Sequence, residues 1–137
     1  MVGKHTAIVR EKINLAGNNW LIKFEFEQDM EFKAGQYLSL KVSDAGDRRS
    51  YSIASRPKGK VLELMADVTP MGVGSKYILG LNVGDKIEAL CPMGTFGAQP
   101  SEVSGQKKML FVATGSGIVP MKPIIEDLLI DQKYKEK

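Results

Sequence analysis

Regular alternation of apolar and polar side chains is the feature of this sequence that most constrains its fold. Between Trp20 and Phe26 every second residue is large and apolar, and charged residues fill two of the three positions between them. A period of two is typical of a β-strand with one buried face. The same alternation recurs over 36–42 and 61–68. The first half of the chain is therefore predicted to form a sheet.

Turn-forming residues separate these segments at short intervals. Glycine, asparagine and aspartate cluster at 16–19 and 44–47, where they favour turns. Further strands are predicted at 5–15, 49–55 and 85–90. Short strands with frequent turns, and no helix in the first half of the chain, are typical of an antiparallel sandwich or a small barrel.

The composition excludes several classes of function. Charged residues make up 26% of the 137 residues, and the net charge of +3 is too small to indicate nucleic-acid binding. Cys91 is the only cysteine, which excludes an internal disulfide and a Cys-x-x-Cys metal or redox site. No apolar stretch is long enough to span a membrane, and no signal peptide is recognisable. A soluble, cytoplasmic protein is expected.

The residues at 49–55 combine groups suited to a ligand with phosphates and a flat ring. Arg49 is a planar donor for phosphate oxygens, Tyr51 can stack on a ring, and a serine hydroxyl can hydrogen-bond a ring nitrogen. Strand alternation places Arg49 and Tyr51 on one face, with Ser50 and Ser52 on the other. An amphipathic strand whose polar side chains face water explains the same residues, because short motifs have many chance matches.

A glycine-rich approach to a helix is the second candidate binding feature. A helix is predicted over 72–79, with Ser75 as its N-cap. Free backbone N–H groups at a helix N-terminus favour an anion. The segment comprises Gly72, Val73, Gly74 and Ser75. An ordinary short capped helix that closes one end of a barrel is the alternative.

The pattern changes after a predicted linker at 98–107. An unbroken apolar run at 109–113 predicts a strand buried on both faces. A helix is expected to start near Val119, because the prolines at 120 and 123 are tolerated only in or near a first turn. Strand, glycine loop and helix together open a nucleotide-binding α/β domain. The loop between them holds Thr114, Gly115, Ser116 and Gly117.

This second unit is incomplete by the usual pattern. Pro120 replaces the third glycine of the dinucleotide fingerprint, and the sequence ends at Lys137 before a second parallel strand. One β-α unit cannot build a doubly wound sheet. The chain is therefore expected to be a fragment of a longer protein, or to pack its last helix against the barrel.

Four motifs in this order resemble those of the ferredoxin–NADP⁺ reductase superfamily, over residues 5–131. Arg49-Ser50-Tyr51-Ser52 resembles the R-x-Y-S flavin motif, and 72–75 resembles the glycine-rich segment that receives the flavin pyrophosphate. The segment 91–96 resembles the G-P-x-G-x-F turn. The segment 114–120 resembles the T-G-[TS]-G-x-x-P loop that opens the pyridine-nucleotide domain.

The resemblance implies a mainly β fold in two parts. Residues 1–104 would form a six-stranded antiparallel Greek-key barrel with one capping helix, the FAD-binding domain. Residues 105–137 would form a single β-α unit of a truncated α/β NAD(P)-binding domain. The implied cofactor is FAD, with FMN less expected, and the implied hydride donor is NAD(P)H.

The resemblance also implies roles for individual residues. Arg49 would neutralise the flavin pyrophosphate, Tyr51 would pack against the isoalloxazine ring, and Ser52 would hydrogen-bond near flavin N5. Tyr51 and Ser52 are thus the residues expected at the reacting centre. The other expected cofactor-binding residues are Ser50, Gly72, Val73, Gly74, Ser75, Thr114, Gly115, Ser116 and Gly117.

The implied activity is that of an FAD-dependent NAD(P)H oxidoreductase that passes electrons to a partner such as a ferredoxin, a flavodoxin or an iron–sulfur subunit. A non-catalytic flavin-binding subunit completed by a partner chain is the alternative, and a small barrel with another ligand is the third. Ala34 and Cys91 depart from the family pattern, and Cys91 is expected to be a buried small hydrophobe. Because most of the nucleotide domain is missing, the chain is expected to bind flavin better than it catalyses turnover of NAD(P)H.

Overall fold

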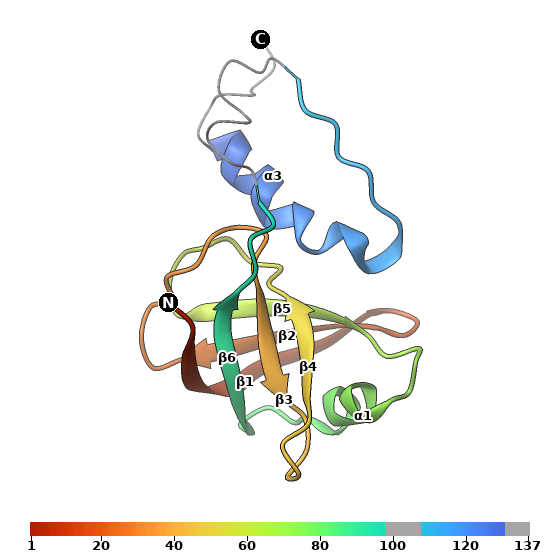
Figure 1. The fold of residues 1–137 in the computed structure, drawn as a ribbon. Coiled ribbons are helices and arrows are strands. Elements are labelled where there is room, and N and C mark those ends of the chain that lie inside the picture. Colours follow the sequence, from red (N-terminus) through yellow and green to blue (C-terminus); the bar gives the residue numbers. More distant parts are fainter. Residues whose placement is uncertain (98–107, 131–137) are drawn as a thin grey trace.

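Six antiparallel strands form the body of the molecule (Figure 1). The structure is a computed structural model, which describes residues 1–97 and 108–130. The sheet order is β4-β3-β6-β1-β2-β5, and β3 pairs with β6 instead of β2, as in a Greek key. A bridge between Ile53 and Leu64 joins the two outermost strands and closes the barrel. The strands are β1 (Gly3–Ala16), β2 (Asn19–Phe26), β3 (Tyr37–Lys41), β4 (Arg48–Ser52), β5 (Val61–Asp67) and β6 (Lys86–Met93).

The alternating residues fill the barrel interior as the sequence predicts. Ile22 and Phe24 on β2 and Leu38 and Leu40 on β3 are completely buried. Burial of each such side chain stabilises the fold by roughly 1.5–3 kcal/mol. Cys91 is also completely buried, and burial raises the pKa of its thiol to about 11. The predicted barrel and the small-hydrophobe role of Cys91 are both confirmed.

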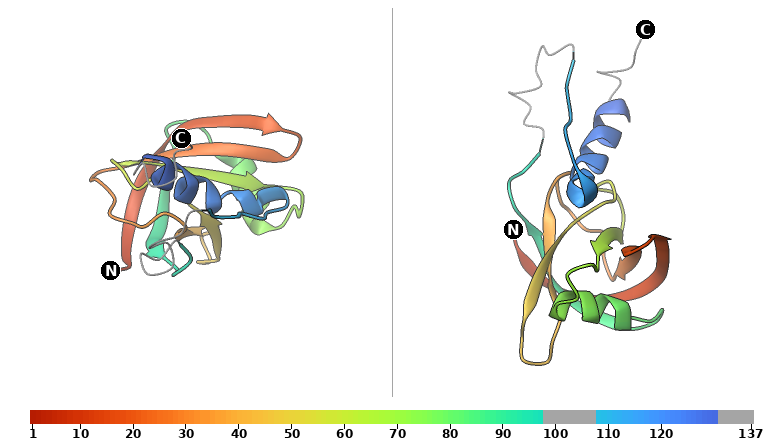
Figure 2. Two further views of the ribbon diagram at one scale, coloured as in Figure 1. Left: turned by 90° about the horizontal axis from the view of Figure 1, so that it is seen from above. Right: turned by 90° about the vertical axis from the view of Figure 1, so that its right-hand side faces the viewer.

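Two helices cover opposite ends of the barrel, as both views show (Figures 1 and 2). Helix α1 (Val73–Gly80) lies beside β4, and helix α3 (Met121–Ile130) follows the 3-10 turn η1 (Gly115–Ile118). An ion pair of 2.8 Å between Arg56 and Asp127 holds α3 to the barrel. Lys122 adds a hydrogen bond of 3.1 Å to the Ala54 carbonyl. The last helix therefore packs on the barrel, one of the two arrangements expected from the sequence.

The predicted buried strand at 109–113 is wrong. These residues form no strand, and the side chains of Leu110 and Val112 are 89% and 73% exposed. The segment stands away from the barrel in both views (Figures 1 and 2). A strand needs a neighbour for its backbone N–H and C=O groups, and the described part of the chain provides none at this position.

Two smaller predictions are also wrong, and others lie outside the described residues. Gly72, not Ser75, is the N-cap of α1, and no side chain caps this end. The turn that the resemblance implies at 91–96 begins only after Met93, because Cys91 pairs with Gly3 and Met93 pairs with Tyr37 in the sheet. The predicted linker at 98–107, the boundary at 104–105 and the C-terminal tail lie outside the described residues.

Candidate functional site

Gly74 is the point at which the first two predicted binding segments meet. A Cβ atom at this residue would lie 2.7 Å from the hydroxyl of Tyr51 and 2.8 Å from Cγ of Arg49. Both distances are shorter than van der Waals contact, so only glycine lets α1 approach β4 this closely. Arg49 and Tyr51 thus share one side of β4, as alternation predicts, and that side faces the N-terminus of α1.

The N-terminus of α1 is free to accept an anion. No side chain caps it, and its first turn contains no acidic residue. The first intrahelical bond runs from Lys76 N–H to the Gly72 carbonyl, so the N–H groups of Val73, Gly74 and Ser75 precede the helical ladder. Unsatisfied N–H groups and the helix dipole both favour negative charge. This end of α1 therefore lacks an electrostatic partner of its own.

Arg49 is a cation without a carboxylate partner among the residues that the structure describes. The other three arginines of the chain each form an ion pair with an aspartate or glutamate. Within the described ranges, Arg49 donates to the carbonyl of its neighbour Arg48, at 2.7 Å, and to no other group. Arg49 is exposed, and its Cβ and Cγ atoms lie beside the uncapped helix. Together these groups form a positively charged corner suited to phosphate.

The backbone of β4 offers a further set of groups that sequence reasoning missed. Ile53 N–H bonds the Gln36 carbonyl toward β3, whereas Ala54 N–H bonds the Glu63 carbonyl toward β5. The N–H and C=O groups of an antiparallel strand alternate in direction, so those of Ser50 and Ser52 point away from β3. No strand pairs with this edge of β4 in the described sheet. A flat polar ligand can therefore lie along it.

Tyr51 holds its ring in a fixed place between this edge and the core. The side chain is half-buried and packs against the hydrophobic cluster. Burial raises the pKa of its hydroxyl, and the positive charge of Arg49 acts in the opposite direction. The phenol is thus neutral at physiological pH and available as a ring surface and a hydrogen-bond donor.

The glycine loop at 114–117 is exposed and lies apart from Arg49. Gly115 has a positive φ of 54°, and no residue of η1 is buried. The turn contacts β5. Figure 1 shows η1 beside α3 at the upper end of the barrel, whereas α1 lies near the lower end. The structure brings two of the three predicted segments into contact and leaves the third apart from them.

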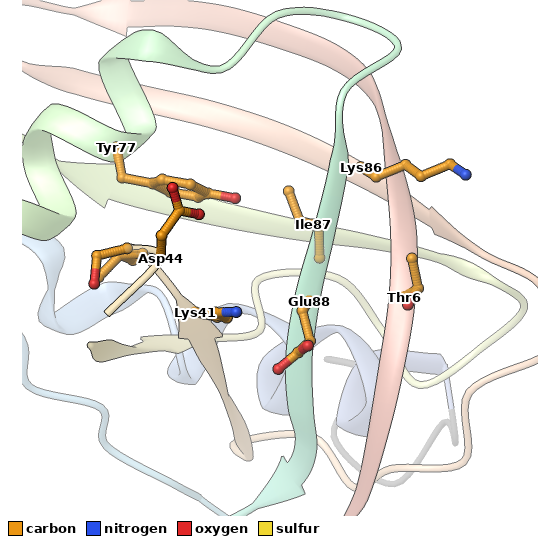
Figure 3. A pocket seen from close by; sticks show the side chains of 9 residues that line it. Thr6, Lys41, Asp44, Tyr77, Lys86, Ile87 and Glu88 are labelled. Carbon is orange, nitrogen blue, oxygen red and sulfur yellow. The ribbon is translucent and has the colours of Figure 1, made fainter. Parts of the chain in front are cut away.

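A separate open cavity of about 470 Å³ lies between α1, β6 and the β3–β4 hairpin (Figure 3). Tyr77 of α1 reaches over it toward Ile87, and its polar lining includes both lysines and carboxylates. No predicted site residue lines it. Within residues 1–97 and 108–130, no group of three histidine, cysteine or acidic residues could hold a metal ion.

A barrel with an uncapped helix N-terminus at its open strand edge, and an arginine there without a carboxylate partner in the described residues, is suited to a nucleotide cofactor. The family profile for the oxidoreductase FAD-binding domain matches residues 6–97. The chain belongs to this family, and its cofactor is FAD.

None of the helices in the described ranges has the length and apolar character needed to cross a bilayer.

Several known proteins that this chain resembles are reductases. The reductase subunit of an aromatic O-demethylase from an Amycolatopsis species is 33% identical over 134 residues, which cover 96% of this chain and 40% of that protein. Ferredoxin–NADP reductase B of Sorangium cellulosum is 35% identical over 97 residues, 69% of this chain and 38% of that protein. The crystal structure of an Amycolatopsis cytochrome P450 reductase superimposes with a TM-score of 0.86 at 32% identity, covering 94% of this chain and 40% of that one. The chain thus spans less than half the length of these relatives.

Proposed function

We propose that this chain is the flavin-binding part of an NAD(P)H oxidoreductase that delivers electrons to a redox partner protein. The observation that carries the proposal is the meeting of Arg49, Tyr51 and the uncapped N-terminus of α1 at Gly74. A flavin dinucleotide has a pyrophosphate between two flat ring systems, the isoalloxazine and the adenine, and this corner offers a cationic, N–H-rich end next to one aromatic ring.

Each residue contributes by binding or orienting the cofactor. Arg49 and the N–H groups of Val73, Gly74 and Ser75 hold the pyrophosphate, with Gly72 as the approach to the helix. Tyr51 supports one face of the isoalloxazine ring. Ser50 and Ser52 present backbone groups along the open edge, and the Ser52 hydroxyl would hydrogen-bond near flavin N5. When bound, FAD supplies the redox chemistry by accepting a hydride and releasing electrons singly or in pairs.

The glycine loop would serve the hydride donor. The loop of Thr114, Gly115, Ser116 and Gly117 lies at the α3 end of the barrel (Figure 1). We assign them to the nicotinamide nucleotide. Residues 1–104 would then be the FAD-binding barrel and residues 105–137 the first unit of an NAD(P)-binding domain. A cytoplasmic location and a ferredoxin, flavodoxin or iron–sulfur partner belong to the same proposal.

A flavin titration tests the proposal. Purified protein mixed with FAD should retain the absorbance bands of flavin, at about 370 and 450 nm, after gel filtration. Arg49→Ala should weaken binding about 10- to 100-fold, because a hydrogen bond to a charged group is typically worth ~1.5–3 kcal/mol. Arg10→Ala, which removes an arginine paired with Glu25, is the matched control and should bind like wild type. Protein that stays colourless with FAD and FMN would refute the proposal.

The exposed apolar segment at 109–113 supports a second candidate, a flavin subunit that is completed by a partner chain. Such a surface is costly to leave in water. Stoichiometric bound FAD without oxidation of NADH or NADPH in the presence of ferricyanide would favour this subunit. Turnover by the isolated chain would favour the oxidoreductase.

A further inference from the structure

Lys12 breaks the pattern of the strand on which it lies. It stands opposite Ile22 in the β1–β2 register, and the side chain of Ile22 is completely buried. Residues opposite each other in antiparallel strands share a face. Lys12 therefore starts from a core-facing position, where an ammonium is costly unless it finds partners.

The partners of Lys12 are at the C-terminal end of α1. Its Nζ atom donates to the carbonyl oxygens of Leu79, at 2.5 Å, and of Leu81, at 2.9 Å. The same atom lies 5.0 Å from the ring centre of Trp20, a cation–π contact. Figure 2 shows the long β1 strand passing this end of the helix. The ammonium is thus held by three groups, two of which belong to the end of α1.

The helix has no comparable group of its own. Its last turn contains no basic residue. Besides the bonds from Lys12, this end has the bond from Leu81 N–H to the Ile78 carbonyl and the bond from the Asn82 side-chain amide to the Gly80 carbonyl, both at 3.3 Å and both from uncharged donors. Burial of Ile78 holds α1 against the barrel, but apolar contacts are non-directional. The two hydrogen bonds from Lys12 are directional, so they fix the orientation of a helix that is only about 12 Å long.

We propose that Lys12 is a positioning residue for the flavin pyrophosphate, which acts through α1 from the opposite end of the helix. The proposal rests on the proposed function of the α1 N-terminus. Lys12 fixes the angle of α1 relative to β4, and with it the direction of the N–H groups of Val73, Gly74 and Ser75. Its charge also neutralises the negative end of the helix dipole. Lys12 touches no part of the cofactor.

The test compares FAD with riboflavin, which has the same ring system but no phosphate. Lys12→Met should weaken FAD binding about fivefold, the range expected for a helix-terminus charge, and leave the Kd for riboflavin unchanged. Lys12→Arg should restore most of the FAD affinity. Lys23→Met, which removes a β2 lysine that pairs with Glu11 and Glu63 away from α1, is the matched control and should leave both affinities unchanged.

Three outcomes decide the matter. Wild-type affinity of K12M for FAD would overturn the role of Lys12 and leave the flavin site itself intact. An equal loss of FAD and riboflavin binding would mean that Lys12 only stabilises the fold, which also overturns it. Failure of the wild-type protein to bind FAD would refute the proposed function first. Lys12→Gln, which keeps one donor without the charge, provides the same comparison if K12M is too unstable to purify.

Discussion

The close approach of α1 to β4 makes Gly74→Ala a sharp probe of the site. The added methyl carbon would lie 2.7 Å from the Tyr51 hydroxyl and 2.8 Å from Cγ of Arg49. Both groups must shift by several tenths of an ångström to reach normal contact, and these are the side chains assigned to the flavin. Loss of one well-placed charge-assisted hydrogen bond, ~1.5–3 kcal/mol, corresponds to about 10- to 100-fold weaker FAD binding.

In the Gly74→Ala variant the free energy of unfolding should change much less than the affinity for FAD. Alanine is favoured over glycine inside a helix by about 1 kcal/mol, and overpacking costs about 1–3 kcal/mol, so the two effects partly cancel. The neighbours are flexible side chains, which can move without unfolding the barrel. The free energy of unfolding should therefore fall by about 2 kcal/mol at most.

Isothermal titration with FAD, together with urea unfolding, checks both expectations. Gly80→Ala is the matched control, since Gly80 lies in the same helix and a Cβ there would meet nothing within 4 Å. G80A should bind FAD like wild type. A folded G74A protein with wild-type FAD affinity would refute the claim that Arg49 and Tyr51 are placed for flavin by their contact with Gly74.

Two further predictions concern titratable groups. Hydrogen bonds from Thr69 lower the pKa of Asp67 below its ordinary 3.8, and a hydrogen bond from Lys4 lowers that of Glu88 below 4.5. Their stabilising effect is complete above these values and is lost as the pH falls through the lower folded-state pKa values. The urea midpoint of unfolding should thus stay level from about pH 7 to 5 and decrease below about pH 4.5. The decrease should be less steep in the Asp67→Asn variant. An equally steep decrease in that variant would contradict a stabilising role for the Asp67 carboxylate. Buried Cys91, with its pKa of about 11, should react with a thiol reagent at pH 8 only after unfolding, whereas fast labelling of the folded protein would show that the interior is open there.

The barrel was predictable from the sequence because each strand shows its own alternation of apolar and polar residues. The side chains of β2 and β3 alternate in a way that only a half-buried strand explains, and Gly35 and Gly46 have the positive φ angles of turns. Local pattern cannot show which residue at the start of α1 adopts the extended N-cap geometry, because Ser75 and Gly72 are both residue types that occur at N-caps. Apolar composition likewise predicted a strand at 109–113, where pairing depends on neighbours outside the segment.

The candidate site was predictable as separate pieces but not as an arrangement. Arg49 and Gly74 are distant in sequence, and only the barrel brings them into contact. The backbone edge at Ser50 and Ser52 has no residue-type signal, since any residue carries the same N–H and C=O groups. Lys12 was hidden for a different reason, because its partners are carbonyl oxygens of another element.

The unpaired edge of β4 has a consequence for the protein before it acquires its cofactor. An exposed strand edge is a template on which a second chain can add a strand, and such pairing leads to aggregation. A flavin bound along Ser50 and Ser52, as we propose, would cover the same groups that a foreign strand would use. The supply of FAD during synthesis would then determine what fraction of the protein self-associates through this edge, because bound FAD would block the pairing of a second chain with β4.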